Sequence, residues 1–245
     1  MSSIVDKVYK KTYTSYIRFL YYILLLKIVI IQLFITFGGG EVKFLTEDFI
    51  SARDRIVSAS IDIISDAGLF SLTMKNISMR TNISEPLIYK YYSNTDEILC
   101  DIVEDYFRFD NGIFKTISSK DEPGVKKVLL YVDAISAYYN SYYSISALML
   151  QYEELLHNTN TREIIEYGYN NRRDFLVNLF KEAEKNKELK DELVPERLAD
   201  TLIGLIHISI LNRRVMNRRK SLKEDINLNV KQLMKTIVNN PEVLS

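Results

Sequence analysis

Hydrophobic residues recur at helical spacing through long stretches of the chain, and no strand-like alternation between turn residues appears. Few breakers interrupt these stretches, since the 245 residues include only 8 Gly and 4 Pro. The pattern therefore predicts an all-α protein. Expected helices in the C-terminal part cover residues 94–117, 123–142, 145–157, 160–187, 195–219 and 223–239, with Pro195 opening one helix and Pro241 closing the last.

Residues 71–99 predict two short helices joined by a tight turn. Thr73 is a good N-cap for the first helix. Asn82 stands where the chain reverses, and asparagine tolerates the left-handed backbone conformation. Ser84 can cap the second helix, and Pro86 suits its first turn because the missing amide hydrogen would have stayed unpaired there. The result is a helix-turn-helix, a unit with which proteins read DNA.

The second of these helices has an apolar side and a polar side. We expect Ile83 and Ile88 to face the core of the unit. The opposite side offers hydrogen-bonding, cationic and aromatic groups that suit base edges, thymine methyls and phosphates, namely Glu85, Leu87, Tyr89, Lys90 and Tyr91. The alternative is that this aromatic segment only packs in a core.

The order of motifs over residues 53–99 resembles the N-terminal region of the TetR family of transcriptional regulators. RIVSASIDIISDAG, TMKNIS, NIS, LIYKYY and DEIL match a helix ending in Ala-Gly, a Thr-started helix, a turn, a helix with Leu-Tyr-x-Tyr-Phe and a long fourth helix. The resemblance implies an N-terminal three-helix helix-turn-helix DNA-binding domain and a C-terminal helical ligand-binding and dimerisation domain. It also implies DNA contacts from Thr73, Lys75, Ser84, Glu85, Pro86, Leu87, Tyr89, Lys90, Tyr91 and Thr95.

Two departures from the family pattern and the charge balance bear on DNA binding. Asn82 replaces the usual turn glycine, and Thr95 replaces a phosphate-binding lysine at the start of the fourth helix. The formal net charge is zero, and residues 43–100 hold 6 Lys and Arg against 8 Asp and Glu, a balance of −2. We therefore expect modest nonspecific attraction to phosphate, and binding must depend on where the few cations and helix N-termini point.

The stretch KNKELKDELVPERLADTLIGLIHISIL resembles the family's passage into its last two helices, which pair with their symmetry mates in a four-helix bundle. Gly204 would permit close approach of two helices there. One stripe of this helix is expected to form the dimer interface, and it consists of Leu198, Leu202, Leu205 and Ser209. An ordinary buried helix is the alternative.

An aromatic and thioether-rich segment lies between the two regions. It could line a pocket for an apolar ligand with a few polar groups, through Tyr131, Tyr138, Tyr142, Met149 and Tyr152. The alternative is ordinary core packing. Arg213, Arg214, Arg218, Arg219 and Lys220 end a helix, where cations suit the dipole, and we expect them to be solvated, with an anionic ligand tail as the other option.

The residues offer little support for catalysis or metal binding. A single cysteine, Cys100, excludes an intramolecular disulfide and fits a reducing cytoplasm, where we expect it to be a buried apolar residue. His157 and His207 are far apart and lack cysteine partners. The adjacent Glu153 and Glu154 are typical of a solvated helix face. We expect no enzymatic activity, no cofactor and no metal.

The N-terminus carries an apolar run at residues 19–37, just long enough to cross a bilayer. Lys27 and Gln32 oppose insertion, since a central lysine costs roughly 2.5–3.5 kcal/mol on insertion scales. We favour a leader translated from a misplaced start, because residues rich in AT codons precede Gly38–Glu41, whose purine-rich codons resemble a ribosome-binding site. A membrane anchor and an extra helix on the dimer are the alternatives.

These observations predict a segment order and a function. Residues 1–45 form an extension, 46–98 the DNA-binding domain and 99–245 the regulatory and dimerisation domain. The expected function is that of a cytoplasmic, homodimeric transcription regulator, a repressor that binds a palindromic operator and is released by a small, apolar effector. The alternative is a membrane-anchored helical sensor or scaffold that binds a protein partner.

Overall fold

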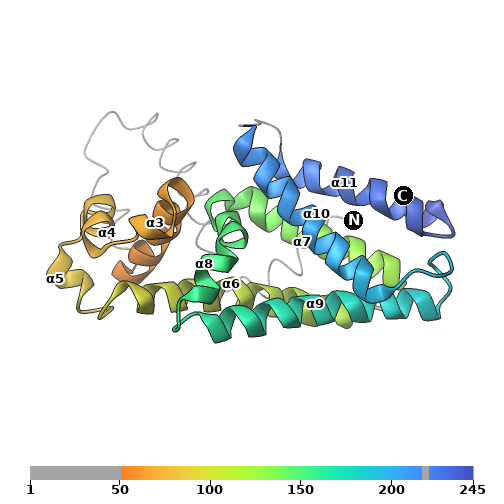
Figure 1. Ribbon diagram of the computed structural model, residues 1–245, viewed down its shortest axis with the longest axis horizontal. Helices are drawn as coiled ribbons and strands as arrows, with labels where there is room; N and C mark the ends of the chain where they lie inside the picture. The colour runs from red at the N-terminus through yellow and green to blue at the C-terminus, as the bar shows by residue number, and fades with distance from the viewer. Residues whose placement is uncertain (1–50, 217–220, 245) are drawn as a thin grey trace, which may run out of the picture. The chain divides into compact units, whose positions relative to one another are not determined.

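Helices joined by short connections make up most of residues 51–216 and 221–244, which the computed structural model describes (Figure 1). Contacts divide the chain into two units, residues 1–56 and 57–245, and only the beginning of one helix is described in the first. The expected apolar run at 19–37, and with it the membrane-anchor alternative, lies outside the described residues. Among the described helices, none has the length and apolar character needed to span a membrane.

The first helices form the expected helix-turn-helix. Helix α3 (Ala52–Ala67) ends at Gly68, whose positive φ of 81° suits glycine, and η1 (Leu69–Ser71) leads to α4 (Met74–Thr81). The Thr73 hydroxyl accepts a hydrogen bond from the Asn76 amide at 3.1 Å, which confirms the predicted N-cap. Asn82 ends α4 in the left-handed conformation, with φ 56°, as predicted.

Helix α5 (Glu85–Ile88) is short, and the turn after it contains Tyr89, Lys90 and Tyr91. In this turn the Lys90 amide bonds to the Leu87 carbonyl at 3.2 Å, the tighter i to i+3 pattern. Ser84 stands at the N-cap, but its side chain makes no capping bond, so that part of the prediction is wrong. The carbonyl of Ser84 instead accepts from the amides of Leu87 and Ile88.

Helix α6 (Thr95–Ser118) agrees with the expected helix at 94–117. The Asn94 side chain accepts from the Glu97 amide at 2.9 Å, and the Glu97 carboxylate accepts from the Ser93 amide at 2.7 Å. These bonds satisfy amides that a helix start leaves unpaired. The helix runs without a break across the expected domain boundary at residue 98, which remains a prediction.

The C-terminal part follows the expected order with one correction. The segment predicted as one helix at 145–157 begins as a 3₁₀ helix. Ser146 Oγ donates to the Tyr143 carbonyl oxygen at 2.7 Å, and a side-chain bond of this kind competes with the backbone bonds of an α-helix. Pro241 opens a short 3₁₀ helix. The elements are α7 (Gly124–Ser141), η2 (Tyr143–Gln151), α8 (Tyr152–His157), α9 (Arg162–Lys185), α10 (Pro195–Val215), α11 (Leu222–Ile237) and η3 (Pro241–Leu244) (Figure 1).

Helix α7 lies at the centre of this packing, in contact with α6, α9 and α11, while α10 packs on α9 and α11. Its N-terminus is fixed by Glu188, whose carboxylate accepts from the amides of Gly124 at 3.0 Å and Val125 at 2.8 Å. A Cβ on Gly124 would lie 2.6 Å from the backbone nitrogen of Ala183. Glycine at this position therefore permits the close approach of α7 to α9.

Candidate DNA-binding and effector sites

Exposed side chains gather on α5 and the turn after it. Tyr89 is 53% exposed, Tyr91 46% and Leu87 38%, and Lys90 is also exposed, whereas Ile88 between them is fully buried. We call these four exposed residues, Leu87, Tyr89, Lys90 and Tyr91, the recognition surface. Its position on a helix-turn-helix, with apolar, phenolic and cationic groups side by side, matches what reading base edges and phosphates requires.

The other predicted DNA contacts lie around the recognition surface in different degrees of exposure. Thr73 at the N-cap of α4 and Lys75 on α4 are exposed, as are Ser84 and Pro86 at the start of α5. Glu85 and Thr95 are half-buried, and Thr95 is the first residue of α6. Whether any of these residues contacts DNA remains a prediction.

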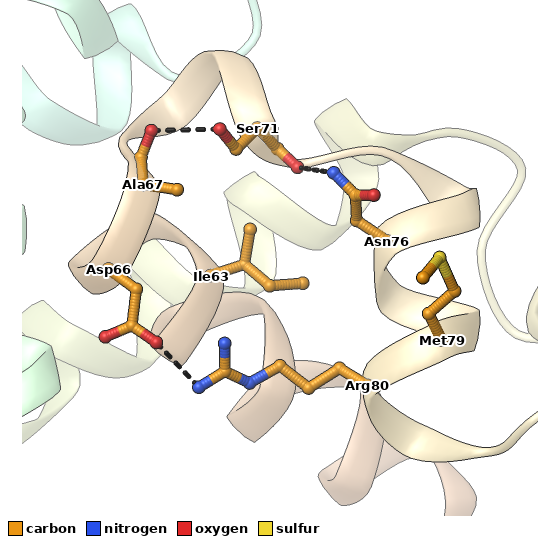
Figure 2. A pocket seen from close by; sticks show the side chains of 7 residues that line it. All are labelled: Ile63, Asp66, Ala67, Ser71, Asn76, Met79 and Arg80. Atoms are coloured by element: carbon orange, nitrogen blue, oxygen red, sulfur yellow. Dashed lines mark hydrogen bonds and ion pairs between the residues drawn. The ribbon is translucent and has the colours of Figure 1, made fainter.

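An open pocket of about 500 Å³ lies between α3 and α4 (Figure 2). Arg80 Nη2 and Asp66 Oδ2 are 2.7 Å apart across it, and Asn76 Nδ2 donates to the Ser71 carbonyl at 2.7 Å. These contacts hold α4 against the end of α3. The lining consists of Ile63, Asp66, Ala67, Ser71, Asn76, Met79 and Arg80, and none of these was among the predicted ligand residues.

The cations of the helix-turn-helix differ in their partners. Arg80 pairs with Asp66, whereas no salt bridge of Lys75 or Lys90 occurs among the described residues. Lys75 on α4 and Lys90 in the turn after α5 are therefore the candidate phosphate contacts. The expected modest attraction to phosphate stays a prediction.

The predicted ligand segment is largely interior. Tyr131, Tyr138 and Met149 are buried, and Tyr142 and Tyr152 are half-buried. The Tyr152 hydroxyl accepts from Arg172 Nη1 at 3.0 Å and donates to the Tyr106 hydroxyl at 3.2 Å. A ligand role for these side chains stays a prediction. Tyr152 belongs to a polar cluster that the sequence analysis missed.

This polar cluster consists of Tyr106 and Asp110 from α6, Tyr139 from α7, Tyr152 from α8 and Arg172 from α9. Arg172 Nε donates to Asp110 Oδ2 at 2.6 Å, and each side chain is 2% exposed. The hydroxyls of Tyr106 and Tyr139 are 2.6 Å apart. The sequence did contain a sign of this cluster. On α6, Asp110 is a charged residue in the stripe formed otherwise by apolar and aromatic residues, among them Tyr106, Phe107, Ile113 and Phe114.

Burial governs the electrostatics of the polar cluster. Burial raises the pKa of Asp110, and Arg172 opposes this shift. Burial alone would lower the pKa of Arg172, but Asp110 and the tyrosines hold it well above its usual range, so the guanidinium stays charged. Asp110 Oδ1 and Arg172 Nη2 are buried without a hydrogen-bond partner.

Arg214 corrects the expectation that the basic end of α10 is solvated. It donates to the carbonyl and the hydroxyl of Ser65 on α3, both at 3.2 Å, and its guanidinium lies 4.6 Å from the ring centroid of Tyr143. Arg213 stacks on the same ring at 5.1 Å. Burial lowers the pKa of Arg214. Arg214 thus ties α10 to α3, whereas Arg218, Arg219 and Lys220 lie outside the described residues.

The predicted dimer stripe of α10 lies largely inside the protomer. Leu198, Leu202 and Ser209 are buried, Leu205 is half-buried, and the Ser209 hydroxyl accepts from Asn229 of α11 at 3.1 Å. Other apolar side chains of the last two helices are exposed, namely Ile208, Leu211 and Val215 on α10 and Leu228 on α11. Buried residues have no accessible area to contribute to an interface. The four exposed residues are therefore better candidates for a dimer interface than the predicted stripe.

The other residues considered for catalysis or metal binding are Cys100 and the polar residues of α8. Cys100 is half-buried, with its sulfur 3.5 Å from the Asn160 carbonyl, and burial together with acidic neighbours raises the pKa of its thiol. Glu153, Glu154 and His157 are exposed on α8. In residues 51–216 and 221–244, no group of His, Cys, Asp and Glu could hold a metal ion.

No protein-family model matches the sequence, and a comparison with curated proteins gives no match either. Solved structures do match. The ketosteroid transcriptional regulator KstR2 of Mycobacterium tuberculosis aligns with a TM-score of 0.68 at 11% identity, over 82% of this chain and 99% of its own.

Two further structures agree with it. A TetR-family transcriptional regulator from Agrobacterium tumefaciens gives a TM-score of 0.62 at 13% identity, over 76% of this chain and 97% of its own. The regulator FadR from Bacillus subtilis, solved in complex with stearoyl-CoA, gives 0.60 at 18% identity, over 74% and 96%. The chain has the fold of TetR-family regulators, so the predicted all-α class and the fold implied by the resemblance are confirmed.

Proposed function

We propose that this chain is a ligand-responsive, DNA-binding transcription regulator that acts as a homodimer and catalyses no reaction. The observation that carries the proposal is the recognition surface, where Leu87, Tyr89, Lys90 and Tyr91 are exposed around the buried Ile88. A contiguous exposed patch with apolar and aromatic side chains often marks a site of interaction. On a helix-turn-helix that partner is the major groove of DNA.

Lys90 and Tyr89 are the proposed principal contacts. A lysine can bind a phosphate or the O6 and N7 atoms of guanine, and a phenol offers a hydroxyl to base edges or phosphate. Lys75 adds a second cation from α4. With so few charges, affinity depends on hydrogen bonds and apolar contacts more than on counterion release, so we expect a shallow salt dependence.

A homodimer would present two recognition surfaces to the half-sites of a palindromic operator. The proposed interface is the exposed apolar face of α10 with Ile208, Leu211 and Val215, extended by Leu228 of α11. A Cβ on Gly204, on the same helix, would meet nothing within 4 Å in the protomer, which leaves room for a second helix.

The effector response is proposed from the fold and from the aromatic interior. One matched regulator was solved with stearoyl-CoA, so this fold can hold a molecule with a long apolar chain. In this chain the proposed site is the region of Tyr131, Tyr138, Tyr142, Met149 and Tyr152. We further propose that the protein is a cytoplasmic repressor, released from its operator when a small, largely apolar effector binds.

DNA binding is tested by selecting a double-stranded library on the full chain and titrating the selected operator by fluorescence anisotropy. Lys90→Ala should lower the salt slope by about one phosphate if the lysine contacts the backbone, or cost roughly 1–3 kcal/mol at one position if it contacts guanine. Lys115→Ala is the matched control, because Lys115 is exposed on α6. Wild-type binding by folded Lys90→Ala and Tyr89→Phe variants would refute the assignment.

The dimer is tested by light scattering. Ile208→Glu places a charge in the proposed interface and should yield monomers, whereas Tyr167→Glu, at a tyrosine that is 70% exposed on α9, should leave the mass unchanged. A dimeric Ile208→Glu variant, or a monomeric wild type at micromolar concentration, would contradict the proposed interface.

A further inference from the structure

The polar cluster is built where α6, α7, α8 and α9 meet, and α6 and α9 lie side by side there (Figure 1). Its charges balance, because it contains one guanidinium, Arg172, and one carboxylate, Asp110. Not all of its hydrogen-bonding atoms have partners. Arg172 uses Nε for Asp110 and Nη1 for Tyr152, but Nη2 has no partner, and neither has Asp110 Oδ1.

The two unpartnered atoms belong to the two groups that form the ion pair. Each is two covalent bonds from an atom of the 2.6 Å contact between Arg172 Nε and Asp110 Oδ2. One is a donor and the other an acceptor. Buried polar atoms are normally satisfied, and leaving both unpaired is unfavourable. A single group that donates and accepts, such as a hydroxyl or a primary amide, would satisfy both.

The charge of the cluster restricts that group further. A carboxylate would place a second negative charge beside Asp110 with only Arg172 to balance both, and burying an unbalanced charge is strongly unfavourable. An ammonium group would create the opposite imbalance. A neutral group adds no charge, and its desolvation costs less free energy than that of an ion.

Aromatic rings surround the cluster and define what the rest of a ligand must be. The Arg172 guanidinium lies 5.0 Å from the centroid of Tyr106 and 5.4 Å from that of Phe107. Tyr152 contacts Tyr106 and Tyr169 edge to face, at 6.5 and 6.2 Å. An aromatic environment of this kind favours an apolar body with a single polar end.

We propose that the effector of this protein carries a neutral hydroxyl or primary amide on an apolar body, and that this group binds between Arg172 Nη2 and Asp110 Oδ1. The inference rests on the proposed function, since it names the chemistry of the effector of that regulator. It adds two residues, Asp110 and Arg172, to the ligand site expected from the sequence.

The test compares three probes with one chain length, 1-octanol, octanoate and octylammonium, by calorimetric titration of the full chain at neutral pH. Octanol should bind at least about tenfold more tightly than either ion, a difference of about 1.4 kcal/mol. Asp110→Asn keeps the shape but leaves Arg172 unbalanced, so the preference should switch to octanoate. Asp105→Asn, at an exposed aspartate of the same helix that pairs with Arg108 at 2.7 Å, should keep the preference for octanol.

Equal affinities of the wild type for octanol and octanoate, or binding of no probe, would overturn the proposal. So would an unchanged preference in a folded Asp110→Asn variant. If that variant does not fold, Tyr152→Phe serves instead, because it removes the hydroxyl that accepts from Arg172 and should weaken octanol binding about tenfold. Operator titration of the wild type is separate, so probe binding without DNA binding would refute only the proposed function.

Discussion

Replacing Arg172 by methionine tests the buried ion pair most directly. Arg172 and Asp110 are each 2% exposed and joined at 2.6 Å, so solvent hardly screens them. Methionine fills much of the space that the aliphatic part of the arginine occupies, but it leaves the Asp110 carboxylate buried without a cation. Removing one partner of a buried pair costs about 3–5 kcal/mol. Losing the guanidinium over the Tyr106 ring removes about 0.5–2 kcal/mol of cation–π attraction. Part of this energy is already included in the cost of breaking the ion pair.

The cost should depend on pH with a definite sign. In the wild type, burial raises the pKa of Asp110 and Arg172 opposes it. Without the guanidinium only burial remains, so the pKa in the folded variant rises further above its unfolded value of about 3.9. A raised folded pKa favours the protonated carboxyl. The contribution of Asp110 to the stability of the variant is therefore most favourable at low pH, and it falls by up to about 1.4 kcal/mol per unit as the pH rises to the folded pKa.

Urea unfolding followed by circular dichroism at pH 4.5 and pH 7 measures both effects. The deficit of Arg172→Met relative to wild type should be larger at pH 7. The control is Arg172→Met with Asp110→Leu, which removes both charges and should recover most of the loss, since apolar replacements of buried pairs are often neutral or stabilising. A single variant within about 1 kcal/mol of wild type, or a double variant as unstable as the single one, would refute the reasoning.

Three further predictions concern a close helix contact, an ion pair and a helix cap. Gly124→Ala should cost about 1–3 kcal/mol in denaturant unfolding, because the new Cβ would meet the backbone of Ala183, which no rotamer can relieve; an unchanged midpoint would contradict the close approach. Asp200→Asn should cost at most about 1 kcal/mol at pH 7, because the hydrogen bond from Arg173 lowers the pKa of this partly exposed carboxyl. That difference should vanish as the pH falls through the lowered pKa, and a constant difference would exclude the ion pair as its cause. Thr73→Ala should cost about 1 kcal/mol in thermal unfolding and Thr73→Ser much less, because only alanine lacks the capping hydroxyl.

The helix-turn-helix could be predicted because its signals act on neighbouring backbone. Thr73 caps the amide three residues on, and Asn82 needs only its own left-handed conformation. Asn94 likewise bonds within the first turn of its helix. The error at Ser84 also concerns neighbouring backbone. Its N-cap position was predicted correctly, but its carbonyl, rather than its hydroxyl, accepts the hydrogen bonds from the amides of the helix.

The interior of the regulatory part could not be predicted, because its contacts join distant segments. Asp110 and Arg172 are 62 residues apart, and Arg214 reaches Ser65 across 149. Helical periodicity shows that one face of α10 is apolar, but it cannot say whether that face packs on its own chain or on a partner. Leu202 therefore looked like an interface residue and is fully buried in the protomer.

The buried tyrosines limit the protein at high pH. Burial raises the pKa of Tyr106, Tyr131, Tyr139 and Tyr152, whereas the unfolded phenols ionise near pH 10. Their contribution to stability is complete below pH 10 and is lost above it, at about 1.4 kcal/mol per pH unit for each tyrosine and about 5–6 for the four together. Because the chain has no Trp, absorbance at 295 nm reports tyrosinate without interference. An alkaline titration should therefore show the exposed phenols ionising first, and then these four appearing in one steep step as the helices unfold.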